Sequence, residues 1–178
     1  MTPYSLAFYL DVITSATVLG VRPSATPDQV TAVLGDDFAE NSADRRSMWR
    51  DYGMAEFFWH RDSANAPWEG HHFTLQVHRL AGGDSRTVND AIRAEYGRFD
   101  RRLRFAKVRR LLERRGVPLV ELPDPANSPH YRRFWQPDSQ VSVSVIGTRE
   151  EFLTPSRLRT DDVYAISGSV PSPVSTGR

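Results

Sequence analysis

The sequence predicts an α+β domain, in which helices pack on an antiparallel sheet of about six strands. A helix-start signal at Thr26 is followed by two strand-like runs on either side of Gly53. Further strand-like runs follow the helical stretch 87–115. Helices thus precede strands twice along the chain. Residues 1–167 are therefore either one α+β domain without internal repetition or two helix-helix-sheet halves, 1–85 and 86–167.

The composition is that of a chain with one core of ordinary size. Its 178 residues are 39% hydrophobic and include 9 Phe, 6 Tyr and 4 Trp. The absence of cysteine excludes disulfides, thiolate metal sites and cysteine nucleophiles. Residues 1–20 are mildly apolar, have no basic start and are interrupted by Asp11. We therefore expect a cytoplasmic protein with neither a signal peptide nor a membrane span.

Two helices are predicted before the first strand. The stretch 4–14 places its apolar residues on one helical face, although the β-branched residues that follow favour a strand. Thr26 and Gln29 then have the spacing of a capping box, with Pro27 at the first helical position. Gly35 is expected to end this helix with a positive φ. The acidic and polar stretch 36–44 is expected to be a loop.

The first group of strands is predicted at 47–52, 55–60 and 73–80. Gly53 separates the first two runs, as in a hairpin. In the third run, apolar and polar residues alternate, which indicates a half-buried strand. The loop 61–72 contains Trp68 in a segment rich in Pro and Gly.

The second half is predicted to begin with helices at 87–97, capped by Thr87, and at 101–115. Strands are then expected at 117–122, 131–135, 141–146 and 162–167. Residues 168–178 contain only Gly, Ser, Val, Pro, Thr and a final Arg. This composition predicts a disordered tail.

Charge is distributed unevenly along the chain. Residues 1–85 have 6 basic and 11 acidic residues, a net charge of −5. Residues 86–115 have 11 basic and 4 acidic residues, a net charge of +7. The arginine-rich part of this window, the helix predicted at 101–115, would bind nucleic acid through phosphate contacts, but no nucleic-acid-binding motif accompanies it. We favour a solvated helix face that pairs with the acidic first half, and we rank nucleic-acid binding third among the functions.

The sequence marks no catalytic residue, no cofactor and no metal site. Four histidines, His60, His71, His72 and His78, occur within one sheet and its loop, but without metal-ligand spacing. Adjacent His71 and His72 are expected to point apart in an extended strand. The carboxylates show no acid–base pair, and no phosphate loop or nucleophile motif is present. The second functional hypothesis is therefore a small-ligand or enzyme site on the sheet face near Trp59 and His78, which a buried polar cluster there would favour.

Aromatic and charged residues point to a protein partner instead. The run Phe57-Phe58-Trp59 cannot place all its rings on one side of a strand, so part of this aromatic surface is either covered by a helix or available to a partner. Trp and Arg are favoured at the centres of protein interfaces, and Trp68 is the aromatic residue that we expect to be most accessible. The candidate partner-binding residues are Asp36, Asp37, Glu40, Asp44, Trp68, Arg101, Arg102, Arg109 and Arg110.

The motifs LGVRPSATPDQVTAVLG, YGMAEFFWH and FTLQVHRL, within residues 19–80, resemble those of small actinobacterial proteins. Some of these look like immunity proteins of polymorphic toxin systems. The outline is also similar to the helix-helix-plus-sheet unit of beta-lactamase-inhibitor-like domains. The motifs specify turns and caps, and no active site is carried over with them. The resemblance implies a non-enzymatic binder that blocks a toxin by covering it.

Overall fold

The computed structural model describes residues 4–83, 85–149 and 157–170. Its α-helices are α1 (Tyr4–Ser15), α2 (Pro27–Leu34), α3 (Asp90–Tyr96) and α4 (Phe105–Arg114). Two 3-10 helices, η1 (Val77–Ala81) and η2 (Ser85–Thr87), precede α3. The strands are β1 (Ala39–Ser42), β2 (Ser47–Asp51), β3 (Ala55–His60), β4 (Glu69–Leu75), β5 (Val120–Leu122), β6 (Tyr131–Gln136), β7 (Val141–Ile146) and β8 (Val163–Ser169).

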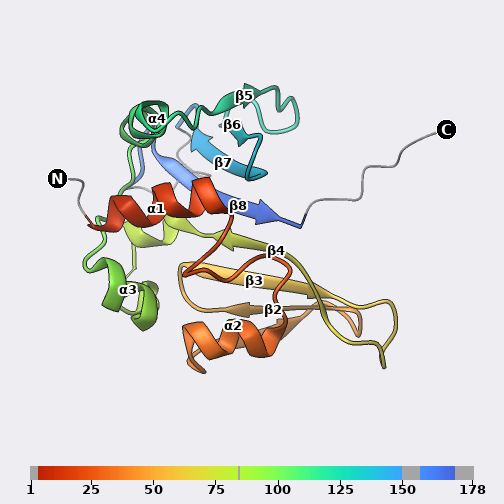
Figure 1. The fold of residues 1–178 in the computed structure, drawn as a ribbon. Helices are drawn as coiled ribbons and strands as arrows, with labels where there is room; N and C mark the ends of the chain where they lie inside the picture. The colour runs from red at the N-terminus through yellow and green to blue at the C-terminus, as the bar shows by residue number, and fades with distance from the viewer. Residues whose placement is uncertain (1–3, 84, 150–156, 171–178) are drawn as a thin grey trace.

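The strands form one antiparallel sheet in the order β1-β2-β3-β4-β8-β7-β6-β5 (Figure 1). The predicted α+β class is confirmed, but the sheet has eight strands rather than about six. The unexpected strand is β1, which lies inside the stretch expected to be a loop. All four β1 residues are exposed, so no alternation of apolar residues indicates this strand.

The order of elements repeats once along the described chain. Helices α1 and α2 precede β1 to β4, and α3 and α4 precede β5 to β8. The last strand of each series, β4 and β8, pair in the middle of the sheet. Among the described residues, the two series pair with each other only through this β4–β8 ladder, which we call the seam.

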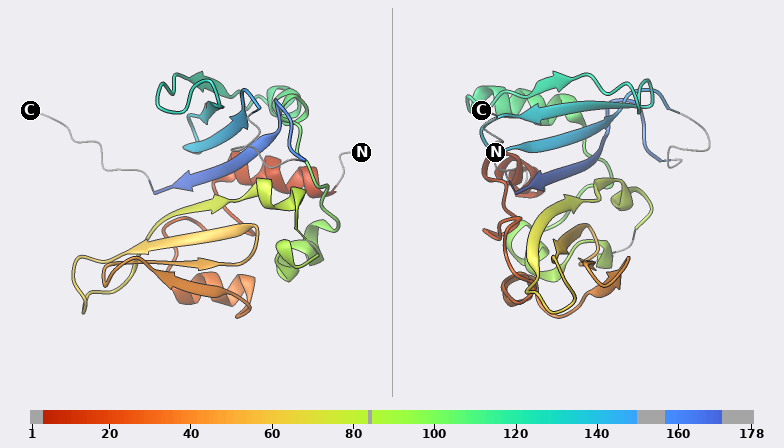
Figure 2. Two further views of the ribbon diagram at one scale, coloured as in Figure 1. Left: turned by 180° about the vertical axis from the view of Figure 1, so that it is seen from behind. Right: turned by 90° about the vertical axis from the view of Figure 1, so that its right-hand side faces the viewer.

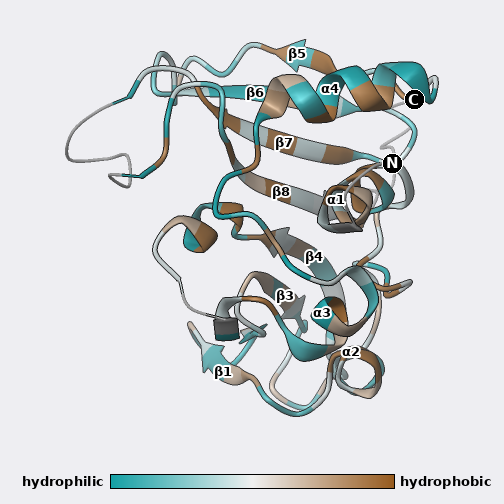
Figure 3. Ribbon diagram, turned by 90° about the vertical axis from the view of Figure 1, so that its left-hand side faces the viewer, coloured by the Kyte–Doolittle hydropathy of each residue, from teal (hydrophilic) through white to brown (hydrophobic). Residues whose placement is uncertain are grey.

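The four α-helices cover one face of the sheet. Figure 3 shows them in front of the strands, and the right-hand view of Figure 2 shows the other face, where no α-helix lies in front. One core forms between the helices and the covered face, with Phe8, Phe57, Phe73 and Phe134 among its largest buried side chains. We call the side without α-helices the open face; η1 packs on part of it, through the bonds of Arg79 to Glu56. A second, small core of Ala81, Ile146 and Leu158, with Tyr131 and Tyr164, lies apart from the main one.

Local sequence signals explain α2 and the hairpin that follows. The Thr26 hydroxyl accepts a hydrogen bond from the Gln29 amide at 3.3 Å, and the Gln29 side chain accepts one from the Thr26 amide at 2.9 Å. The predicted capping box is thus confirmed, and Gly35 follows the helix with a φ of 84°. Gly53 has a φ of 90°, and its amide donates to Asp51 Oδ1 at 2.8 Å. This positive φ allows the tight turn between β2 and β3.

Three predicted boundaries of helices and strands are wrong. Residues 77–81 form η1 and not the end of a strand. The cap of α3 is Asn89 rather than Thr87, because the Asn89 side chain accepts from the Ala91 amide at 2.9 Å. Helix α4 begins at Phe105 and not near 101, because the main chain before it bridges to the start of β8: the Val163 amide donates to the Leu103 carbonyl at 2.8 Å.

The C-terminal boundary also differs from the prediction. Strand β8 continues to Ser169, so Gly168 and Ser169 belong to the sheet and not to a disordered tail. Pairing with His72 and Phe73 of β4 accounts for these two residues. Val170 follows the strand, and its amide donates to the His71 carbonyl at 3.0 Å; the rest of the predicted tail, 171–178, lies outside the described residues.

Candidate functional site

The open face carries a row of stacked rings across β2, β3 and β4. The register pairs Trp49 with Phe58, and Phe58 with His72. The Trp49 and Phe58 rings are 6.1 Å apart at 20°, and the Phe58 and His72 rings are 4.1 Å apart at 7°. Each of the three side chains is partly exposed. We call Trp49, Phe58 and His72 the aromatic row; Phe57 and Trp59, which alternate with Phe58, are buried on the covered face.

A β-bulge brings His71 beside this row. Phe58 pairs with His72 and Trp59 pairs with Gly70, so His71 is an extra residue in β4. The Nδ1 atoms of His71 and His72 are 2.7 Å apart. The expectation that these histidines point apart is therefore wrong, because a bulge breaks the strict alternation of side chains along a strand. Burial, together with the neighbouring His71, lowers the pKa of His72 to about 4.

Hydroxyl side chains occupy the middle of the open face. The register pairs Thr74 with Ser167, Ser167 with Ser142, and Ser142 with Trp135. The Thr74 and Ser167 hydroxyl oxygens are 3.0 Å apart across the seam. We call Thr74, Ser142 and Ser167 the polar row. It provides donors and acceptors between the aromatic row and Trp135.

Arg79 ties η1 to the strands through a charged cluster. Its guanidinium donates to Glu56 Oε1 at 2.6 Å, to Asp51 Oδ2 at 2.9 Å and to the Gly53 carbonyl at 2.6 Å. Gln76 donates to the second Glu56 oxygen at 2.6 Å. Glu56 is only 5% exposed. Both Glu56 oxygens are therefore occupied, and the cluster acts as a structural clamp.

Trp59 and His78 do not share a sheet face, which corrects the second hypothesis. Trp59 is buried on the covered face, and its indole donates to the Ala25 carbonyl at 2.8 Å. His78 belongs to η1 and stacks on Tyr164 at 4.2 Å and 5°. Burial lowers the pKa of His78, and its Nδ1 atom is buried without a hydrogen-bond partner among the described residues. The buried polar cluster does exist, but it is centred on Glu56.

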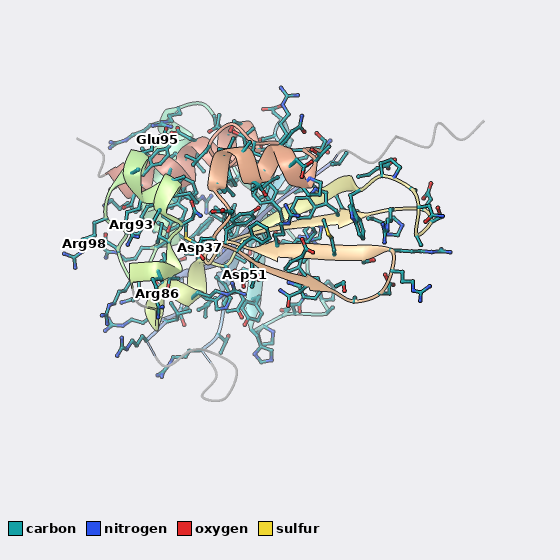
Figure 4. The ribbon with its side chains drawn as sticks, turned by 90° about the horizontal axis from the view of Figure 1, so that it is seen from below. Asp37, Asp51, Arg86, Arg93, Glu95 and Arg98 are labelled. Carbon is teal, nitrogen blue, oxygen red and sulfur yellow. The ribbon has the colours of Figure 1, made fainter. Side chains whose placement is uncertain are left out.

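The predicted acidic residues lie in two places. Asp36 and Asp37 line a polar pocket of about 670 Å³ between the end of α2, the β2–β3 turn and the start of α3. Asp51, Arg86 and Arg93 also line this pocket, and Figure 4 shows them around Asp37. The Arg93 guanidinium pairs with Asp90.

Glu40 and Asp44 lie away from that pocket. Glu40, on β1, accepts from Arg50 Nε at 2.9 Å. Asp44 accepts from the Arg46 amide at 2.7 Å, and this hydrogen bond lowers the pKa of Asp44. The four predicted carboxylates therefore do not form one cluster.

The structure brings Glu40 and Trp68 together. Both line a depression of about 390 Å³, which also includes Asp28, Met48 and Pro67. Trp68 is partly buried and packs against the main core, so it is less accessible than expected. The Arg61 guanidinium lies 4.0 Å from the centre of its ring, a cation–π contact.

The predicted arginines do not form one helical surface. Arg101 and Arg102 precede α4, and Arg102 makes a bidentate ion pair at 2.6 and 3.0 Å with Asp162, which is 1% exposed. Arg109 pairs with Glu113 on the same helix. Arg110 is exposed and lines a depression of about 330 Å³ with Arg104 and Lys107. Pairing with the acidic first half is seen at Arg115, which lies 3.5 Å from Asp11.

No protein-family model, curated protein or solved structure matches the chain.

No group of three or more His, Cys, Asp or Glu side chains in the described part of the chain is placed to hold a metal ion. None of the helices described there is long and apolar enough to cross a membrane.

The aromatic row was missed as a site by sequence reasoning, although the run Phe57-Phe58-Trp59 gave a signal. The sequence showed that one ring must face away from the others. It did not show that the Phe58 ring would lie on the side of the sheet without α-helices. It also did not show that Trp49 and His72 would align with this ring across neighbouring strands.

Proposed function

We propose that this protein is a non-enzymatic protein-binding module that docks its partner on the open face. The observation that carries the proposal is the aromatic row, three partly exposed rings that stack in register across β2, β3 and β4. The partner class that fits best is a toxin domain, which an immunity-type inhibitor would block by occlusion. This part rests on the resemblance of residues 19–80 to immunity proteins.

The physical properties of the aromatic row suit protein recognition. Large rings supply much apolar contact area and dominate the binding energy of many interfaces. Here the rings are already ordered by mutual stacking, so binding immobilises few additional side-chain rotamers. The polar row beside them offers hydroxyl groups for hydrogen bonds at the rim of a contact.

The acidic charge around the aromatic row favours a partner with a basic surface. Residues 1–85, which form α1, α2 and β1 to β4, have a net charge of −5. Asp44 is exposed in the turn between β1 and β2, and Glu40 is exposed on β1, where it pairs with Arg50 on the covered side of the sheet. Complementary charge at the rim of an interface raises the association rate and suppresses wrong partners. An immunity protein that binds a basic toxin domain would use its charge in this way.

A second candidate function is small-ligand binding in the pocket lined by Asp37, Asp51, Arg86 and Arg93. Its volume of about 670 Å³ lies within the range of small-molecule sites. Carboxylates and guanidinium groups together suit a zwitterionic ligand. However, Asp51 is already engaged by Arg79 and by the Gly53 amide. The pocket therefore ranks behind the aromatic row.

The first experiment is an affinity pull-down of the tagged protein from its native host, with and without nuclease, read by mass spectrometry. A stoichiometric protein partner that survives nuclease is expected. Nuclease-sensitive material alone would instead indicate nucleic-acid binding through the arginine-rich stretch 101–115 and would overturn the proposal.

Substitutions then locate the docking surface. Phe58→Ala is expected to weaken binding of the captured partner about tenfold or more, as for an interface hot spot. Val33→Ala is the matched control, because Val33 is a 39% exposed apolar residue on α2, on the covered side of the sheet. Equal affinity for Phe58→Ala and the wild type, with both folded, would contradict docking at the aromatic row.

A further inference from the structure

The bulge in β4 brings His71, which the docking proposal does not use, against His72 of the aromatic row. It places the Nδ1 atoms of His71 and His72 2.7 Å apart, with the two rings inclined at 76°. We call these two residues the histidine pair. His71 is exposed, so the pair is open to solvent.

We propose that the histidine pair binds a divalent late transition-metal ion, Cu²⁺ or Ni²⁺, through its two Nδ1 atoms. Imidazole nitrogens bind such ions at about 2.0 Å. At the observed 2.7 Å separation, a metal ion about 2.0 Å from both nitrogens subtends an angle of roughly 85°. This is close to the angle between neighbouring ligands in a square-planar or octahedral site, the geometries of Cu²⁺ and Ni²⁺.

The same geometry disfavours zinc at this place. Tetrahedral coordination would require the two nitrogens to lie about 3.3 Å apart at ordinary Zn–N distances. The bulged backbone would have to open to reach that separation. The stability order of divalent ions with nitrogen ligands also places Cu²⁺ above Zn²⁺.

Metal binding requires a change of tautomer in one ring of the pair. In the metal-free pair one Nδ1 atom donates a hydrogen bond to the other. A metal ligand must offer a free lone pair, so on metal binding the hydrogen on that Nδ1 atom moves by way of solvent to the Nε2 atom of the same ring. Both Nδ1 lone pairs are then available, and this tautomer change releases no net proton.

The neighbouring structure holds both ligands in place. The Phe58 ring stacks on His72 at 4.1 Å and 7°. The His71 carbonyl accepts from the Val170 amide at 3.0 Å, and His72 pairs with Ser169 across the seam. The two imidazoles are the protein donors, and water completes the coordination shell.

The test is a titration of the full, tag-free protein with Cu²⁺ at neutral pH, followed by calorimetry and by electron paramagnetic resonance. One ion per chain and hyperfine coupling to two nitrogens are expected. His71→Ala is expected to lower the affinity about tenfold or more. His60→Ala is the matched control and should leave it unchanged, since His60 is another exposed histidine on a neighbouring strand.

Circular dichroism establishes that each variant is folded. Equal affinity of His71→Ala and the wild type, or loss of binding in His60→Ala, would overturn the histidine pair as the site, and so would Zn²⁺ binding more tightly than Cu²⁺. The titration contains no protein partner. Its failure would therefore leave the docking proposal standing, and failure of the pull-down would leave the metal site standing.

Discussion

Gly168 of β8 lies against the ring of Phe73 on β4, at the seam between the two helix-and-strand series. A Cβ atom at residue 168 would lie 2.6 Å from two carbons of the Phe73 ring. Phe73 is 0% exposed and packs beside Phe57, with the ring centroids 5.7 Å apart. The absence of a side chain at residue 168 therefore leaves room for the Phe73 ring at the seam.

Gly168→Ala is expected to lower the free energy of unfolding by about 1–3 kcal/mol, because the added methyl group overpacks the core. Chemical denaturation measures this change. Gly82→Ala is the control, since a Cβ atom there meets nothing within 4 Å and the backbone φ is −113°. Equal effects of the two substitutions would contradict the close contact at the seam.

Thr26→Ala is expected to destabilise the protein by about 1 kcal/mol, because the amide at Gln29 loses its capping acceptor. Thr26→Ser retains the hydroxyl group and should remain near the wild-type stability. Both values come from urea denaturation curves. If the serine variant lost as much stability as the alanine variant, the capping hydrogen bond would not be the cause.

Arg102→Met is expected to lower stability by about 3 kcal/mol, because it leaves the buried Asp162 carboxylate without its bidentate partner. Adding Asp162→Asn to that variant should recover part of the loss, which a double-mutant cycle measures. Arg109→Met is the control. Its ion pair with Glu113 is about half exposed on both sides, so the expected change is within about 0.5 kcal/mol.

Acidification is expected to destabilise the protein partly through His78. Burial lowers the folded-state pKa of this ring below its usual value of 6.5, so the unfolded chain takes up a proton first as the pH falls. Arg79 lowers this pKa further, whereas Glu56 and a hydrogen bond to the Tyr164 main chain oppose the shift. Stability is therefore expected to fall as the pH drops below 6.5.

His78→Phe tests this contribution, because phenylalanine can still stack on Tyr164 and cannot be protonated. Denaturation midpoints between pH 5 and 8 should fall less steeply in this variant than in the wild type. Identical slopes would show that His78 contributes nothing to the acid sensitivity.

Trp68→Ala and Glu40→Lys examine the depression that these two residues share. If the partner is basic and extends from the aromatic row to this end of the sheet, both substitutions weaken binding, and Glu40→Lys does so chiefly by lowering the association rate. Surface plasmon resonance at two salt concentrations separates the effects. Unchanged association and dissociation rates for both variants would show that the partner contacts the open face and not this depression.

Elements with local signals were predicted well from the sequence. The capping box defines α2 through bonds within four residues, and Gly53 defines the hairpin through its own φ. Strand β1 has no such signal, because it is a strand only through its pairing with β2. Residues 77–81 alternate like a strand, yet Arg79 folds back to Asp51 and Glu56, and the chain forms η1.

The candidate sites depend even more on tertiary structure. Trp49, Phe58 and His72 align only because three strands adopt one register. His71 and His72 meet only because of a bulge, which has no signature in the sequence HH itself. Among the partner-binding residues predicted from composition, Glu40 and Trp68 come together, whereas Asp36 and Asp37 lie in another pocket and Arg101 precedes the helix expected to carry it.

The seam has a consequence for assembly. In the part of the chain that the structure describes, all strand pairing between the two series runs through β4 and β8, so a chain that released one series from the other would expose two complementary sheet edges. A second chain opened in the same way presents the same two edges, and exchange of the C-terminal series between two molecules would restore every seam hydrogen bond without any new contact. In such an intertwined dimer the Gly168–Phe73 contact would join two molecules instead of two parts of one.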